Sequence, residues 1–126
     1  MTDDEIDALE AGVRLDFKVA KACDVEFYSS TSIGRRGEIG PPSVVVLDEN
    51  KNAKPFRPSS DWNDAMWVVV KFFGSTQVNV AHVGKNGGDT PWHTWVDEVP
   101  SIETQAASGP VAICRAILKA VKNAST

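Results

Sequence analysis

The stretch Pro55–Gly74, PFRPSSDWNDAMWVVVKFFG, decides the fold, because it reads as a loop that leads into a long apolar helix. Apolar residues recur there at i, i+3, i+4, i+7 and i+11, which places them on one side of a helix. This predicted core stripe consists of Trp62, Ala65, Met66, Val69 and Phe73. Val68, Val70 and Phe72 widen the stripe, so we expect the helix to be covered on more than one side.

The loop before this helix combines a cation, hydroxyls and a carboxylate in the order Arg57, Ser59, Ser60 and Asp61. The serines offer hydroxyls to the unpaired N–H groups of the first turn, and Gly74 is the residue type that best ends a helix. A helix N-terminus is also a common anion site. We therefore treat these four residues as candidate ligand-binding residues, with simple helix capping as the alternative.

Composition indicates one soluble globular domain spanning residues 1–126. The chain has 126 residues, 42% hydrophobic and 24% charged, with a net charge of −4, which argues against a general nucleic-acid binder. No apolar run approaches the roughly 20 residues that span a bilayer, and no signal peptide is expected. Cys23 and Cys114 lack a metal-binding spacing, so we expect reduced thiols in a cytosol, with a disulfide as the alternative.

The N-terminal third predicts two helices and a strand. Thr2 and Glu5 form a capping-box pair for a short first helix, and Val13–Cys23 has one apolar and one basic face. Val25–Tyr28 is a candidate strand. The following segment, Ser29–Pro42, is rich in Ser, Gly and Pro, and predicts a long loop.

Two arginines in that loop are candidate phosphate contacts. Arg35 and Arg36 lie between glycines, which let a backbone approach an anion closely, and arginine binds phosphate oxygens with two hydrogen bonds. The pattern is neither a Walker nor a dinucleotide-binding motif, so a mobile solvated loop is the alternative.

The rest of the chain alternates strands and helices. Three consecutive valines predict that the strand Ser43–Leu47 is covered on both faces, and a polar turn follows it. Gln77–Val96 predicts a β-hairpin, Glu98–Ala107 an irregular connection, and Pro110 the first turn of a last helix. Few strands, about three helices and two-sided cover together predict an α/β fold, a three-layer α-β-α sandwich around one small, mainly antiparallel sheet.

Three segments resemble the phage ABA-sandwich domain proteins, which are small proteins of bacteriophages and prophages. They are the N-terminal MTDDEIDALEAGVRLDFKVA, with Leu15-Asp16 and Val19-Ala20, the middle segment Pro58-Ser59-Ser60-Asp61, and the closing Pro110–Leu118. The Ser29–Pro42 loop and the Asn86–Pro91 turn depart from the pattern. The resemblance implies an α-β-α fold and a phage origin, hence the host cytoplasm as location, but no single activity.

Catalytic chemistry finds little support in the sequence. His82 and His93 are the only imidazoles, and two histidines without a neighbouring cysteine or carboxylate pair make a weak metal site. There is no GxSxG motif for a nucleophilic serine. We therefore expect no catalytic residue, no metal and no cofactor.

The residues favour binding instead. Trp92 and Trp95 on the hairpin suit a nucleobase or a protein hot spot, with a core position as the alternative. Arg115, on a basic row of the last helix, is a candidate phosphate contact in a pocket shared by a homodimer, with a solvated or ion-paired side chain as the alternative. By analogy with phage anti-defence sponges, we expect sequestration of a cyclic nucleotide signal; the alternative is a protein that binds and inhibits a host protein.

Overall fold

The computed structural model describes residues 2–30, 35–39, 43–47, 50–74, 76–97 and 101–124. The helices are α1 (Asp3–Asp7), α2 (Val13–Ala22), α3 (Trp62–Phe73) and α4 (Gly109–Ala124). Thr2 caps α1 through its hydroxyl, as predicted. None of the helices in these ranges is long and apolar enough to cross a membrane.

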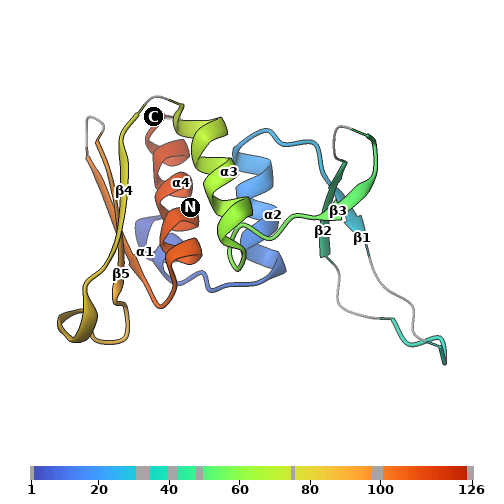
Figure 1. The fold of residues 1–126 in the computed structure, drawn as a ribbon, viewed down its shortest axis with the longest axis horizontal. Helices are drawn as coiled ribbons and strands as arrows, with labels where there is room; N and C mark the ends of the chain where they lie inside the picture. The colour runs from blue at the N-terminus through green and yellow to red at the C-terminus, as the bar shows by residue number, and fades with distance from the viewer. Residues whose placement is uncertain are drawn as a thin grey trace.

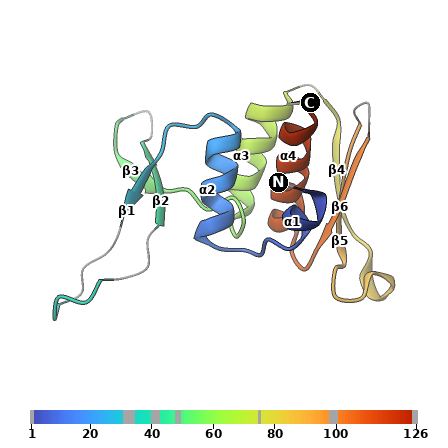
Figure 2. The same ribbon diagram turned by 180° about the vertical axis from the view of Figure 1, so that it is seen from behind.

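The strands form two antiparallel sheets, one at each end of the molecule (Figures 1 and 2). The first sheet consists of β1 (Tyr28–Ser30), β2 (Ser43–Leu47) and β3 (Ala53–Pro55). The second consists of β4 (Val78–His82), β5 (Trp92–Val96) and β6 (Ile102–Ala106), with a 3-10 turn (Gly84–Gly87) between β4 and β5. The predicted hairpin is confirmed, because β4 and β5 pair from Val78↔Val96 to His82↔Trp92.

The predicted α/β class with small antiparallel sheets is confirmed, but the layers are arranged differently from a sandwich with one central sheet. The helices lie in the middle and a sheet covers each side of them (Figure 1). The valine run explains the difference. Val44 and Val46 are buried, whereas Val45 between them is only half-buried, so the strand needs cover on one face only.

Three strands lie wholly or partly where the sequence predicted other structure. Strand β1 starts at the last residue of the predicted strand Val25–Tyr28 and continues into the predicted loop. The segment predicted as irregular contains β6, in which Ile102, Thr104 and Ala106 are buried and Glu103 and Gln105 are exposed. That alternation is the period of a half-buried strand, but Glu, Gln and Ala are poor strand formers. The short strand β3, whose residues are all exposed, overlaps the end of the predicted polar turn Asp48–Lys54.

Helix α4 is the centre of the core. Its residues from Gly109 to Leu118 are all buried. The helix packs against β5 and β6 on one side and against α2 and α3 on the other. Small residues at Ala112, Ala116 and Ala120 let neighbouring elements approach closely, and this explains how one helix is covered on several sides.

Helix α3 has the predicted extent, but its buried face is rotated from the predicted one. Its buried residues are Ala65, Val68, Val69 and Phe73. Trp62 and Met66, which the sequence placed in the core stripe, are 42% and 44% exposed. The N-cap is Asp61, whose carboxylate accepts from the N–H groups of Asn63 and Asp64, and Gly74 ends the helix with a φ of 60°.

Candidate functional site

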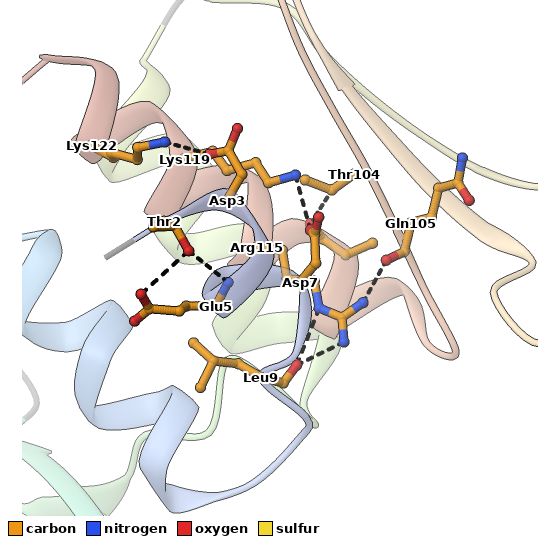
Figure 3. A network of polar contacts seen from close by, with 11 residues as sticks. Thr2, Asp3, Glu5, Asp7, Leu9, Thr104, Gln105, Arg115, Lys119 and Lys122 are labelled. Carbon is orange, nitrogen blue, oxygen red and sulfur yellow. Dashed lines mark hydrogen bonds and ion pairs between the residues drawn. The ribbon is translucent and has the colours of Figure 1, made fainter.

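Arg115 is a structural anchor rather than an open cation. Its side chain donates from Nε and Nη2 to the carbonyl of Leu9, at 3.1 and 2.8 Å, and from Nη1 to the carbonyl of Gln105 at 2.6 Å (Figure 3). The residue is only 9% exposed, and burial lowers the pKa of its guanidinium, while Asp7 and Glu10 act in the opposite direction. These bonds join the segment after α1 to β6 through α4.

The surroundings of Arg115 are acidic. A polar pocket of about 450 Å³ beside it includes Asp7, Glu103 and Lys119 in its lining. Lys119 already pairs with Asp7 at 2.9 Å. The negative charges of Asp7 and Glu103 would repel a phosphate bound at this position. The predicted role of Arg115 as a ligand contact therefore finds no support in the geometry.

Ser59 lies inside the protein. Its N–H donates to Oδ1 of Asp16 at 2.8 Å, and its hydroxyl accepts from the N–H of Gly12 at 3.0 Å. Both Ser59 and Asp16 are buried, at 0% and 4% exposure. Burial raises the pKa of the Asp16 carboxyl, and the hydrogen bonds from Ser59 act against that shift. This contact fixes the loop before α3 onto the start of α2.

The other residues of that loop do not form an anion site. Ser60 and Arg57 are exposed, Asp61 serves as the helix cap, and the backbone N–H of Arg57 donates to Oδ2 of Asp64 at 2.9 Å. Two carboxylates therefore occupy the N-terminal end of α3, where a bound anion would otherwise be favoured.

The hairpin tryptophans are half-buried on opposite faces of the second sheet. Trp92 makes edge-to-face contacts with Trp62 of α3, at 5.2 Å between ring centroids, and with His82, at 4.9 Å. Trp95 contacts His93 at 5.5 Å, and Nδ1 of His93 lies 4.0 Å from Glu103. Within the described residues, no cluster of His, Cys, Asp or Glu is suited to hold a metal.

Arg35 and Arg36 lie far from the other candidates. Both are exposed, and the backbone N–H of Arg36 donates to Glu38 at 2.8 Å. Figure 1 shows this segment, in cyan, at the end of the molecule opposite β4–β6. The nine residues predicted to bind a ligand are therefore dispersed over the molecule, and their role stays a prediction.

Among the described residues, all the large hydrophobic residues that are exposed on a helix lie on α3. Trp62, Met66, Trp67 and Val70 are 42%, 44%, 48% and 67% exposed, and we call these four residues the α3 surface. The sequence contained an indication of this surface, because Ala65–Val70 has no polar residue. A helix that is apolar all round is normally buried, yet in this chain one side of it faces outward.

A pocket of about 770 Å³ adjoins this surface, between α3 and the first sheet. Trp67 lines it and makes an edge-to-face contact with Phe56 at 5.9 Å. Nζ of Lys71 lies 5.5 Å from the Trp67 ring centroid, and Lys54 also lines the pocket. Three carboxylates, from Asp24, Glu26 and Asp64, share the lining. The pocket thus has mixed charge beside an aromatic ring.

The fold and this site together define an α/β protein with a helical core, two outer antiparallel sheets and one apolar helix surface in contact with solvent. No family model matches the sequence, and a search of curated proteins finds no similar one. The resemblance to phage ABA-sandwich proteins therefore rests on the quoted motifs alone.

Proposed function

We propose that this protein acts by binding another protein, not by catalysis, and that the α3 surface is the binding site. The observation that carries the proposal is the exposure of two tryptophans, a methionine and a valine on one helix. Contiguous exposed apolar surface of this kind typically marks an interface, and Trp is enriched among the residues that dominate binding energy. A phage protein that binds and inhibits a protein of its host would be one member of this class.

A photo-crosslinking experiment tests the proposal. A benzophenone amino acid replaces Val70, which is 67% exposed, and a matched control carries it at Lys21, an exposed position on α2. After irradiation in cells, we expect a protein adduct from position 70 and none from position 21. If neither position gives an adduct, or both give the same adducts, the α3 surface is not a specific protein-binding site.

A second candidate function is favoured by the pocket beside Trp67. We propose that a purine nucleotide would stack its base on Trp67, pair its amino groups with Asp24 or Glu26, and place phosphate near Lys54 and Lys71. Sequestration of a cyclic nucleotide needs this kind of binding without turnover.

Calorimetric titration with cyclic dinucleotides, cyclic trinucleotides and cyclic ADP-ribose isomers tests this second candidate. We expect Lys54→Ala to weaken any binding, whereas Lys18→Ala, on α2, serves as a control outside the pocket. The absence of heat with every nucleotide would remove the idea without affecting the protein-binding proposal.

A further inference from the structure

The outward side of α3 has a regular seam. Asn63, Met66, Trp67 and Val70 are exposed and follow the spacing i, i+3, i+4 and i+7, which places them in one row along a helix. The midpoint of this row falls between Met66 and Trp67. A seam of this spacing is the pattern by which one helix packs against another.

The charges beside the seam are self-complementary. Asp64 and Lys71 are seven positions apart, so both lie on the same flank of the helix. They lie on opposite sides of the seam's midpoint, with Asp64 toward the N-terminus. If a second α3 packs antiparallel across a two-fold axis at the midpoint, Lys71 of each helix lies two residues, about 3 Å along the axis, beyond Asp64 of the other. The long side chain of lysine can span that offset. Two ion pairs then flank the apolar contact, and the helix dipoles are also antiparallel.

We propose that the occupant of the α3 surface is a second copy of this chain, packed antiparallel about a two-fold axis through the seam. The inference rests on the protein-binding function proposed above and names its partner. A two-fold contact uses the same patch on both copies, and a patch that carries both members of an ion pair, one on each side of the axis, meets that requirement. A patch with charges of one sign would instead favour binding to a different protein that carries the opposite charge.

An open strand edge lies on the same side of the molecule. Figure 1 looks onto α3 and β4, whereas Figure 2, from behind, looks onto α1, α2 and β6. In the described part of the chain, β4 pairs with β5 alone, and its sequence, VNVAH, has no charged residue and no proline. Strand edges that must stay unpaired usually carry such residues.

This edge supplies area that the helix seam lacks. Stable interfaces bury about 800 Å² on each partner, and four partly exposed side chains provide only part of that area. In the two-fold arrangement, β4 of one copy would run antiparallel to β4 of the other beside the paired helices. The two sheets would then continue into one another.

Light scattering combined with charge reversal tests the dimer. We expect wild type to have twice the mass of one chain, and Met66→Asp to be monomeric with an unchanged circular dichroism spectrum. Asp64→Lys and Lys71→Asp should each weaken the dimer roughly tenfold, because like charges then face each other across the axis. The double variant should recover most of the wild-type affinity, since each pair is restored with reversed sign. Asp64→Asn controls for loss of the hydrogen bond from Arg57.

The outcomes separate the two proposals. A monomeric wild type at the highest soluble concentration, or a double variant no tighter than the single ones, overturns the two-fold model. If the position 70 adduct described above then has the mass of this chain plus a different protein, protein binding stands and only the partner is wrong. An adduct of twice the chain mass, together with recovery in the double variant, supports both proposals.

Discussion

The backbone N–H of Ser59 donates a 2.8 Å hydrogen bond to Oδ1 of Asp16, although 43 positions separate the two residues in the sequence. Both are buried, so the bond connects α2 to the entry of α3 inside the core. The bond fixes the loop before α3. The Asp16 carboxyl group that accepts it lies in the core, where its charge is poorly solvated.

The first prediction concerns the pH dependence of stability through Asp16. Burial raises its pKa in the folded state above the usual value of 3.8, so the folded protein holds this proton more tightly than the unfolded chain does. The stabilisation from this group is therefore greatest below pH 3.8 and is lost as pH rises through the raised pKa. Asp16→Asn removes this titration, while its amide oxygen can still accept from Ser59.

Urea unfolding of both proteins at pH values on either side of 3.8 measures the effect. We expect the unfolding free energy of wild type, minus that of Asp16→Asn, to decrease as pH rises. A difference that stays constant or increases would show that the carboxyl group is better solvated, or better hydrogen-bonded, than the geometry indicates.

The second prediction concerns Arg115. Arg115→Met keeps an apolar stem of similar length but leaves the carbonyls of Leu9 and Gln105 without these donors. Hydrogen bonds from a charged donor contribute about 1.5–3 kcal/mol, so we expect Arg115→Met to destabilise the protein by about this amount. Arg14→Met, at an exposed position on α2, should change stability by less than about 0.5 kcal/mol. Equal effects in denaturant unfolding would mean that the Arg115 bonds contribute little.

The third prediction concerns Gly109, where α4 begins against α3. A β-carbon at this position would overlap the six-membered ring of Trp62. Alanine normally stabilises a helix relative to glycine, but here we expect Gly109→Ala to destabilise by about 1–3 kcal/mol through overpacking. In a Trp62→Ala background the penalty should disappear or change sign. Thermal unfolding of the four proteins forms the double-mutant cycle, and an equal penalty in both backgrounds would refute the contact.

The fourth prediction compares two positions on α3. Val68 is fully buried, whereas Met66 is 44% exposed. Val68→Asp places an unpaired charge in the core, which costs several kcal/mol and is comparable with a total domain stability of about 5–15 kcal/mol. We expect Val68→Asp to be unfolded and Met66→Asp to be folded, as judged by circular dichroism and proteolysis. The opposite result would mean that the buried face of α3 is misassigned.

Much of the local structure could be predicted because its signals are local. The capping by Thr2, the extent of α3 up to Gly74, and the β4–β5 hairpin follow from side-chain hydroxyls, glycine conformation and period-two alternation. Strand β6 has the same alternation, but it was not predicted because Glu, Gln and Ala are poor strand formers. In each case the signal comes from a short stretch of sequence, and even the hairpin pairs strands that are adjacent along the chain.

The candidate site could not be predicted in the same way. Arg115 was selected as a cation on a helix, but the carbonyls of Leu9 and Gln105 that bind it come from distant segments. Ser59 was selected for its hydroxyl at a helix start, and its partners are likewise distant in sequence. The sequence indicates what a side chain can donate or accept, and the tertiary structure decides which partner it meets.

The sequence by itself determined an α/β composition, the positions of most elements, and an α3 helix whose middle, Ala65–Val70, has no polar residue. Only the tertiary structure decided that the helices lie between two sheets, and that the side of α3 with Met66 and Val70 stays in contact with solvent. The physical reason is that helix formation depends on neighbours along the chain, whereas burial depends on which surfaces remain after the core has packed around α4.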